Sequence, residues 1–596
     1  MKNLLTLLLS VFAISSVKAA VPQSWKAYFY SVPEEKNITQ LKFKNGVPVM
    51  PDGSPIKSRT VSARNNFFDF NKMTDKNHVI LVGKFKSDKE YDTYLGIGCL
   101  AFAVELNGKN IYEFRRKGLG NDYDPVSAND HIIPAKIQKG ENTIVVYSCR
   151  TNWLLDYCYG ATRQIKWNFT IQELSNYQPV KAALAHPEVL LRPEENKISV
   201  FFITEKPVQA GVDYRIAGTQ KWTRQWDLDG EVALRDTERN HIICLDELKA
   251  DTLYEYRLVL LQPPVGGEKR SLWGDRYHKE IFTEIKTFKT LGKKNLNFFA
   301  LADTQLSISE TLRTVADREK YMTNMRNMPE FKKADFIAHI GDMTSYFHGI
   351  EKDLVADFFD SFSAQKDAKP WVYVRGNHEL DGIEASSWHK YFIPEGQKPY
   401  YCFKNGDTLF IVLACGDTTK GNLNAHIGPI LDTEYMVKKQ RAWLEKLVKS
   451  DDFKNAKFRI VLSHITPQID AGPMGKDLRA IATPLLSESI HLWIGGHCHR
   501  YWRMFKGSNL LYSREKAPTA YHQAVAPFNW LTLDGPKGNQ NPPDLSYIHV
   551  TLNDKLIDAK VIDPDGKVVD HFTVDEHGNA TEISRMQSVI PTKLGK

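Results

Sequence analysis

Five short segments in the second half of the chain carry side chains that bind metal ions. They are Asp303-Thr-Gln305, Gly341-Asp342, Gly376-Asn377-His378-Glu379, Val461-Leu-Ser-His464 and Gly496-His497-Cys-His499. Each follows a short apolar run that is typical of a buried strand. Because sites in α/β sheets assemble at the carboxyl ends of strands, we expect these side chains to meet. Together, carboxylates, amides and imidazoles in this order predict a two-cation site of the kind used for hydrolysis.

The segments differ in how specific they are. A Gly-Asp pair or a single Ser-His is common, and a lone histidine is usually a satisfied structural residue. Gly-Asn-His-Glu after an apolar strand is rarer, and Gly-His-x-His is more specific still, because two imidazoles on one turn can serve neighbouring cations. A purely structural role is the alternative, which the occurrence of all five segments in one chain disfavours.

The elements around these segments predict an α/β domain over residues 295–575. Continuous apolar runs indicate strands that are buried on both faces, and helical patterns lie between them. The runs are residues 298–301, 336–340, 371–374, 409–414, 459–462 and 490–494, and the helical patterns are residues 308–327 and 435–449. Residues 576–596 have neither pattern, so we expect a loose C-terminal tail.

Two all-β sandwich domains are predicted ahead of the α/β domain, over residues 20–178 and 182–290. In the first, the Asn107-Gly108 dipeptide predicts a hairpin turn, and the pattern around it weakly resembles jelly-roll, galactose-binding-like modules. Such a module would either bind glycans or act as a spacer, and we favour the spacer. The glycan-stacking candidates are Trp153, Tyr157 and Tyr159.

The second sandwich contains a stretch at residues 248–256 that resembles the tyrosine corner of fibronectin type III domains, with Tyr254 and Tyr256 as the tyrosines. We expect this domain to serve packing only.

Composition predicts a globular protein, and the first residues of the chain predict that it is exported. The 596 residues are 42% hydrophobic and 25% charged, which is ordinary for globular proteins of about three domains. Residues 1–19 form a predicted signal peptide, with Lys2 ahead of an apolar core and Val17-Lys-Ala19 as the cleavage pattern. A formal charge of +7, spread along the chain, gives no nucleic-acid-binding signature. Without a later membrane-spanning run, we expect a periplasmic or secreted protein.

Seven cysteines in so long a chain do not predict a disulfide scaffold, and the odd number leaves at least one thiol. Cys149 and Cys158 are close enough in sequence to form a disulfide, and the sequence favours neither the bonded nor the free form. Cys402 and Cys415 flank an Asn405-Gly406 turn whose register would not place them opposite each other, so we expect no bond there.

The motifs resemble those of the calcineurin-like metallophosphoesterase superfamily, and within it the purple acid phosphatase-like branch. The segments that carry the resemblance are "ADFIAHIGDM", "RGNHE", "VLSH" and "GGHCHRYWR". It covers about residues 182–572. It implies a four-layer β-sandwich flanked by helices, a phosphate-ester substrate, and two divalent or mixed-valence ions of iron, manganese or zinc that share a bridging hydroxide.

The resemblance also implies roles for single residues. The first cation would be held by Asp303, Asp342 and His499, with Gln305 as a further group, and the second by the shared Asp342 together with Asn377, His464 and His497. The neighbouring His378 would stabilise the transition state and protonate the leaving group, or else only orient a ligand. His339 and Glu379 are expected to be structural, Cys498 to have no chemistry, and Arg375, Arg500, Tyr501 and residues 468–478 to be candidates for substrate contact.

Two departures from the family pattern concern the first cation. Gln305 stands where the branch has glycine and the wider superfamily has histidine. Tyr346 lies four residues after Asp342, and Ser345 occupies the place of the iron-binding tyrosine. An amide oxygen is a weaker ligand than imidazole or phenolate, so we expect no iron-tyrosinate centre.

Three functions follow as hypotheses. The preferred one is an exported phosphomonoesterase, and the second is a phosphodiesterase that uses the same site. The third is a glycan- or surface-binding protein whose metallophosphoesterase domain has decayed. No nucleophile elbow, P-loop or dinucleotide fingerprint supports another catalytic class.

Overall fold

The computed structural model divides the chain into two compact units. Unit 1 comprises Met1–Lys181 and Gln262–Lys279, and unit 2 comprises Ala182–Leu261 and Glu280–Lys596. The residues that the structure describes are 21–22, 24–32, 41–64, 67–99, 101–115, 127–128, 130–150, 167–229, 233–235, 238–265, 279–292, 295–305, 315–345, 347, 349–363, 368–394, 396–415, 433–469, 472–514, 522, 525–535 and 546–595. The predicted signal peptide, Tyr346, Cys158 and the three glycan-stacking candidates lie outside them.

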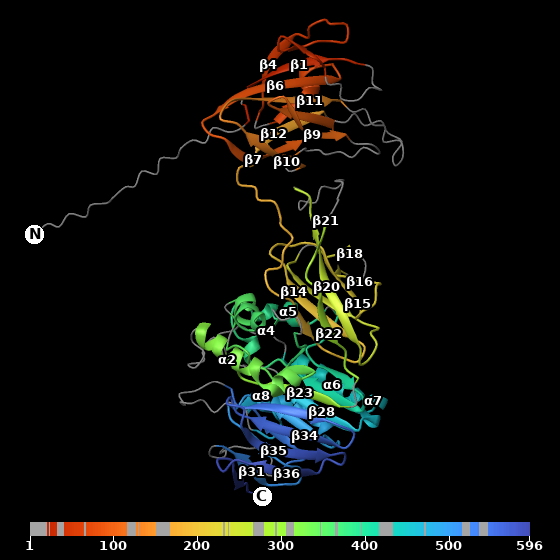
Figure 1. Ribbon diagram of the computed structural model, residues 1–596, viewed down its shortest axis with the longest axis vertical. Coiled ribbons are helices and arrows are strands. Elements are labelled where there is room, and N and C mark those ends of the chain that lie inside the picture. The colour runs from red at the N-terminus through yellow and green to blue at the C-terminus, as the bar shows by residue number, and fades with distance from the viewer. Residues whose placement is uncertain are drawn as a thin grey trace, which may run out of the picture. The chain divides into compact units, whose positions relative to one another are not determined.

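Unit 1, drawn in red to orange in Figure 1, is a two-sheet β structure. The larger sheet has the order β4 (Ser58–Ser62), β1 (Ser24–Tyr30), β6 (His78–Ser87), β11 (Gly140–Cys149), β8 (Ala101–Leu106), β9 (Lys109–Arg115). The smaller has the order β10 (His131–Ile137), β7 (Tyr91–Gly98), β12 (Asn168–Glu173), β5 (Phe67–Asp69). Side chains of both sheets, among them Trp25, Phe102 and Phe169, share one buried core. The predicted hairpin turn is confirmed, because Asn107 and Gly108 join β8 to β9 with φ of 53° and 79°.

Two short elements complete the described part of this unit. These are the pair β2 (Phe43–Lys44) and β3 (Val47–Pro48), and the helical turn α1 (Phe70–Met73).

Unit 2 is built on two large sheets. The ten-stranded sheet has the order β19 (Asn240–Leu245), β14 (Ile198–Ile203), β13 (Val189–Leu191), β25 (Trp371–Tyr373), β24 (Phe336–His339), β23 (Leu296–Leu301), β33 (Tyr547–Leu552), β34 (Leu556–Ile562), β35 (Val568–Asp575), β36 (Ala580–Arg585). The eight-stranded sheet has the order β26 (Tyr401–Asn405), β27 (Thr408–Leu413), β28 (Phe458–Ser463), β29 (Leu492–Gly495), β32 (Trp530–Thr532), β30 (Trp502–Met504), β31 (Leu510–Ser513), β37 (Ile590–Lys593). Strands β23 to β25, and β27 to β29, run parallel.

Alternate side chains of the central strands face two different cores. On β23, Phe298 and Ala300 join a core that also contains Phe410 and Ile460 of the other sheet, so the two sheets pack face to face. Phe299, between them, faces helices instead. These runs are apolar throughout because both faces of each strand are covered. The prediction of an α/β domain is confirmed.

Helices cover the outer face of each sheet. Those on the ten-stranded sheet and in the segment after β25 are α2 (Val315–Asn327), α3 (Pro329–Lys333), the π-helix η1 (Glu351–Phe359), α4 (Asp360–Ser363), η2 (His378–Leu380), η3 (Ala385–Ser387) and α5 (His389–Phe392). Those on the eight-stranded sheet are α6 (Thr433–Leu447), α7 (Asp451–Asn455), α8 (Gly472–Ala482) and η4 (Thr483–Leu485). Two sheets between two helical layers therefore make four layers.

The second predicted sandwich is not a separate compact unit. Its strands β15 (Ala210–Ile216), β16 (Thr223–Trp226), β20 (Leu253–Gln262), β21 (Lys279–Phe282) and β22 (Lys286–Lys289) form one sheet, with β17 (Leu228–Asp229) and β18 (Ala233–Leu234) as a small pair. Its other strands belong to the ten-stranded sheet, where Leu191 of β13 pairs with Trp371 of β25. The Tyr254 hydroxyl accepts a hydrogen bond of 2.9 Å from Lys249 N, which is the tyrosine-corner contact expected from the sequence.

The prediction of a loose tail at residues 576–596 is wrong. Within it, β36 pairs with β35, and β37 pairs with β31. Most of their side chains are exposed, so the sequence lacks the alternation that marks a half-buried strand. The positions of β36 and β37 are set by backbone hydrogen bonds to their neighbouring strands, and not by burial of their own side chains.

Cys402 lies opposite Ile411 in the β26–β27 hairpin, and no disulfide joins it to Cys415, as expected. Among the described residues, no helix is both long and apolar enough to cross a membrane.

Candidate metal centre

The predicted ligands lie where parallel strands of both sheets end. Asp303 follows β23, Asp342 follows β24 and Asn377 follows β25; His464 follows β28, and His497 and His499 follow β29. Several of the turns have left-handed backbone, which is uncommon for residues other than glycine and concentrates at functional sites. These are Asp303, Gln305, Asp342, His497 and His499, with φ of 54°, 41°, 55°, 70° and 50°.

One group of ligands gathers around Asp342. A carboxylate oxygen of Asp342 and ring nitrogens of His464 and His497 all lie within 4.8 Å of one another. His464 Nε2 is 2.9 Å from Asp342 Oδ2, and His497 Nδ1 is 3.0 Å from Asn377 Oδ1. The donor set is one carboxylate, one amide and two imidazoles, which suits a divalent transition metal.

A second group gathers around Asp303. His499 Nε2 is 3.6 Å from Asp303 Oδ1, and Gln305 Nε2 is 3.2 Å from His499 Nε2. His464 Nε2 is 3.8 Å from Asp303 Oδ1, which joins the two groups. Gln305 Oε1 is buried and accepts no hydrogen bond from a described residue, so an oxygen donor is available to a cation. The residues therefore fit two neighbouring cations.

Backbone groups and glycines hold the two carboxylates in place. His497 N donates to Asp303 at 2.9 Å, and His378 N donates to Asp342 Oδ1 at 3.0 Å. A Cβ on Gly376 would lie 2.2 Å from Asp342 Oδ1, and one on Gly496 would lie 2.4 Å from Asp303 Oδ2. The two motifs need glycine because the carboxylates occupy the space of a side chain.

Burial and charge shift the pKa values of this cluster in opposite directions. Burial raises the pKa of Asp303 to about 8. Burial alone would raise the pKa of Asp342, but His464 outweighs it and lowers that pKa. Burial alone would lower the pKa of His464, but the two aspartates outweigh it and raise the pKa to about 10. Near neutral pH, a proton on His464 therefore competes with a cation.

Metal affinity is expected to rise with pH. Because the raised pKa values keep His464 protonated below about 10 and Asp303 protonated below about 8, binding cations there must release these protons. With at least one released proton, the apparent dissociation constant should fall about tenfold or more per pH unit between about pH 6 and 8. Titration of the chelator-treated protein with zinc in buffers of fixed ionic strength measures this. A pH-independent constant would show that His464 is not a ligand.

Glu379 braces the loops that carry Asp342 and Asn377. Its buried carboxylate accepts hydrogen bonds from Asp342 N, Met343 N and Gly376 N at 3.0, 2.8 and 2.7 Å, and from the Tyr373 hydroxyl at 2.8 Å. One anionic side chain thus fixes the turns after β24 and β25 relative to each other. This contact agrees with the structural role predicted for Glu379.

Glu379→Gln is expected to destabilise unit 2 by about 3 kcal/mol. The amide keeps the shape but brings an NH2 group against donors, and each buried donor left without an acceptor costs about 1–3 kcal/mol. Urea denaturation followed by tryptophan fluorescence measures the change. Glu445→Gln on the exposed face of α6 is the matched control and should cost less than about 0.5 kcal/mol. Equal stability of the two variants would contradict the bracing role.

His378 lies beside the cluster with one ring nitrogen held from behind. Its Nδ1 is 2.8 Å from Ser345 O and 3.1 Å from Asp381 Oδ2, and its Nε2 is 3.9 Å from Asp342 Oδ2. Burial lowers its pKa, but Asp381 and Asp342 outweigh burial and raise it to about 9. The ring therefore carries a proton near neutrality. The sequence analysis missed Asp381, although its spacing of three residues from His378 on one turn was a usable signal.

The other candidates have structural contacts. His339 Nε2 is 3.1 Å from the Thr304 hydroxyl, between the ligands of the first motif, and burial lowers its pKa to about 3. The prediction that Tyr501 contacts the substrate is wrong, because its side chain is buried and its hydroxyl donates a 2.6 Å hydrogen bond to Asp570. Its side chain lies in the core between the two sheets. The register of the strands decides this position, and the local sequence does not indicate it.

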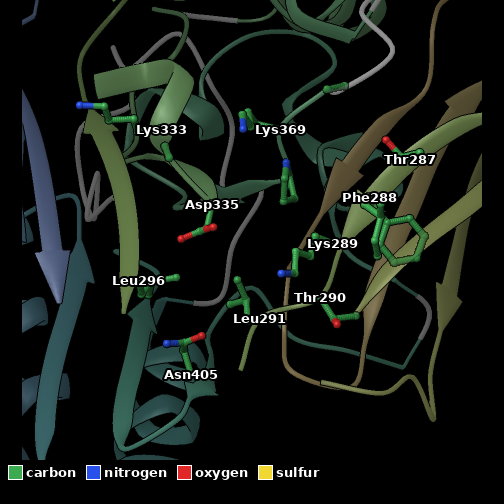
Figure 2. Close-up of a pocket in the computed structure, with 14 residues that line it drawn as sticks. Thr287, Phe288, Lys289, Thr290, Leu291, Leu296, Lys333, Asp335, Lys369 and Asn405 are labelled. Atoms are coloured by element: carbon green, nitrogen blue, oxygen red, sulfur yellow. The ribbon is translucent and has the colours of Figure 1, made fainter. Parts of the chain in front are cut away.

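A cavity of about 330 Å³ in unit 2, shown in Figure 2, lies away from this cluster. Its lining includes Leu296 at the start of β23 and Asp335 and Pro370, which directly precede β24 and β25. These are the amino ends of the parallel strands, whereas the ligands follow the carboxyl ends. The metal centre and this cavity are therefore at opposite ends of the parallel strands.

Residues 296–501 match the sequence model of the calcineurin-like phosphoesterase family. No curated protein matches the chain. Among solved structures, the chain is similar to PhoD, at 12% identity and a TM-score of 0.44 over 67% of this chain and 92% of that one. It is also similar to purple acid phosphatase PPD1 from yellow lupin (Lupinus luteus) seeds, at 15% identity and a TM-score of 0.44 over 84% of this chain and 93% of that one.

At TM-scores below 0.5 these likenesses assign neither a branch nor a substrate. The family match spans the five motifs up to His499, and the ligand geometry around Asp342 lies within it. The resemblance inferred from the sequence is confirmed at the level of this family. The chain therefore carries a calcineurin-like phosphoesterase domain and is a metal-dependent phosphoesterase.

Proposed function

We propose that the protein is an exported phosphoric-ester hydrolase that prefers phosphomonoesters, in the manner of acid phosphatases. The observation that supports this function is the convergence of ligands from both sheets around Asp342, with the protonated ring of His378 beside them. A carboxylate shared by two ligand groups and an adjacent acid are the parts that hydrolysis of a phosphate ester needs.

Two ligand groups would hold the cations. They are Asp303, Asp342, His499 and Gln305 for one, and Asp342, Asn377, His464 and His497 for the other. When bound, ions of iron, manganese or zinc supply Lewis acidity that activates water and neutralises phosphoryl charge. The chain's own part is to hold the carboxylates through His497 N and His378 N, so that the ligands keep their geometry when a substrate binds.

His378 supplies the proton for the leaving group in this proposal. Ser345 O and Asp381 accept from its Nδ1, which leaves Nε2 directed toward the cluster. A proton on Nε2 can pass to the alkoxide oxygen as the ester bond breaks.

Comparing two chromogenic esters tests the substrate preference. With p-nitrophenyl phosphate and bis-p-nitrophenyl phosphate, we expect kcat/KM to favour the monoester by about tenfold or more, which is about 1.4 kcal/mol of transition-state binding. The opposite ratio would favour a phosphodiesterase. A purified protein with well under one equivalent of metal and no chelator-sensitive hydrolysis would favour a decayed domain that binds surfaces or glycans.

Export rests on residues 1–19. Cleavage after Ala19 would give a mature chain that begins at Ala20. Amino-terminal sequencing of protein from the periplasm or medium tests the processing.

Tyr346→Phe is expected to leave the visible spectrum of the iron-loaded enzyme unchanged. A violet band needs a tyrosinate bound to ferric iron, and Ser345 stands at the position where the purple acid phosphatase-like branch has that tyrosine. If the wild-type enzyme has a violet band and Tyr346→Phe lacks it at equal iron content, the shifted tyrosine binds iron.

A further inference from the structure

Two adjoining cavities of unit 2 lie at the amino ends of the parallel strands, away from the metal centre. The first, of about 330 Å³, is the one that Figure 2 shows. The second, of about 470 Å³, lies beside it, because Ala368 and Lys369 line both. Ile337 N donates to Pro370 O at 2.9 Å, so the segments that enter β24 and β25 are neighbours here. Neither cavity has a part in the proposed hydrolysis.

Four separate segments bring positive side chains to these cavities. The basic lining residues are Lys289 of β22, Arg326 of α2, Lys332 and Lys333 of α3, and Lys369 before β25. Figure 2 shows Lys289, Lys333 and Lys369 around the first cavity. Among the described lining residues, Asp335 is the only acidic one, and its carboxylate accepts a hydrogen bond of 2.9 Å from Asn297 N. The fold therefore makes a strongly positive lining from residues that are spread along the sequence.

Three of these lysines have no acidic partner in the part of the chain that the structure describes. Lys332 and Lys333 are exposed and Lys369 is partly exposed. None of the three ammonium groups forms an ion pair or a hydrogen bond with a described residue. Like charges that gather without counter-charges repel one another, so this group would gain from a bound anion.

The other two basic residues keep some charge available. Lys289 pairs with Asp251 at 2.7 Å, but their side chains are 41% and 50% exposed, so water weakens this pair. Arg326 donates to the Ser361 carbonyl and the Thr323 hydroxyl, which are both neutral.

Stabilisation of helix α3 explains only part of this cluster. Lys332 and Lys333 stand in the last turn of α3, where the partial negative charge of a helix carboxyl end favours lysine. Lys289, Arg326 and Lys369 lie outside that helix, so its charge does not account for them.

The lining also indicates which kind of anion fits. Most of the basic residues are lysines, whose ammonium binds phosphate as a point charge, whereas arginine suits planar carboxylates. The aromatic lining residues offer no ring for stacking of a base or a sugar, because all are buried: Phe288, Phe331, Phe362 and Trp371. A chain of phosphate groups therefore fits better than a nucleic acid or a glycan.

We propose that these two cavities bind a linear polyanion of closely spaced phosphate groups, at a site separate from the metal centre. Lys332, Lys333 and Lys369 supply the main positive charge, and Lys289 and Arg326 flank them. Because the site lies at the other end of the parallel strands, a chain bound there leaves the metal centre open. The site would hold the enzyme on a phosphate-rich polymer, whichever ester the metal centre hydrolyses.

Binding of end-labelled linear polyphosphate to the full-length, metal-loaded protein tests this site. Fluorescence anisotropy gives the dissociation constant at several salt concentrations, with excess inorganic phosphate present so that the probe does not occupy the metal centre. In Lys333→Gln/Lys369→Gln, we expect affinity at low salt to fall about tenfold. The slope of log affinity against log salt should become shallower by about 1.5, because each phosphate contact accounts for about 0.7–0.9.

Two further double variants separate the site from net charge. Lys446→Gln/Lys449→Gln removes the same charge from exposed positions at the end of α6, which covers the other sheet, and should bind like the wild type. Lys333→Arg/Lys369→Arg keeps the charges and should keep the wild-type slope. Equal affinity of the wild type and Lys333→Gln/Lys369→Gln, or an equal loss in the α6 variant, would overturn the site. Tighter binding of single-stranded DNA or heparin than of polyphosphate would overturn the choice of ligand.

Discussion

Asp342→Asn is expected to remove both metal occupancy and turnover. In the proposed assignment Asp342 is the side chain that both ligand groups share, and His464 Nε2 lies 2.9 Å from its Oδ2. A neutral amide cannot offset the charge of two cations, so affinity falls at both positions. Elemental analysis should show metal content dropping from about two equivalents to well under one. At the same time, kcat/KM for p-nitrophenyl phosphate should fall about a thousandfold or more, which is about 4 kcal/mol.

Asp452→Asn is the matched control for this substitution. Asp452 is exposed on α7 and pairs with Lys404 at 3.1 Å, outside both ligand groups. This variant should keep the wild-type metal content and rate, because exposed ion pairs contribute little. An Asp342→Asn protein that retains two equivalents of metal would show that the aspartate does not bridge the cations.

His378→Ala is expected to keep the metals and lose turnover. The ring lies beside Asp342 but is not needed to complete either ligand group. Loss of a general acid typically costs about 10²- to 10⁴-fold in rate. The loss should be greatest for esters of poor leaving groups, such as glycerol 3-phosphate, and smaller for p-nitrophenyl phosphate, whose phenolate departs without a proton.

His389→Ala controls for the removal of an imidazole. His389 Nδ1 also faces a backbone carbonyl, that of Ser386 at 3.0 Å, but its ring is exposed and outside both ligand groups. It should keep the full rate on both esters. A His378→Ala enzyme with an undiminished rate on glycerol 3-phosphate would refute the acid role and leave His378 an orienting residue.

The parts of the site that could be predicted are those encoded locally. An apolar run followed by Gly-Asn-His-Glu or Gly-His-x-His marks the end of a buried strand and its ligands in a few residues. That is why His464 and His497, more than 30 residues apart in sequence, could be assigned to one cluster before their 5.3 Å ring separation was known. The α/β character followed in the same way, because strands covered on both faces leave continuous apolar runs.

The parts that could not be predicted depend on pairing between distant segments. Nothing local to Leu191 indicates that it will pair with Trp371, 180 positions later, and strands β36 and β37 have mostly exposed side chains, polar and apolar alike. The contact of Tyr501 with Asp570 also depends on register between separate strands. Local propensity is a weak guide where backbone hydrogen bonds to a remote strand decide the structure.

The catalytic half of the chain on its own would lose the pairing of β13 with β25. Leu191 lies beside Trp371, and Arg192 N donates to Trp371 O at 2.9 Å, so β13 occupies what would otherwise be the border of the parallel strands. A truncation that begins near residue 295 would strip β25 of this neighbour and expose unsatisfied backbone groups beside a large aromatic ring. Bare strands of that kind recruit other chains and aggregate. The β-rich segment before residue 290 thus covers what would be an edge strand of the catalytic sheet and prevents it from pairing with other chains.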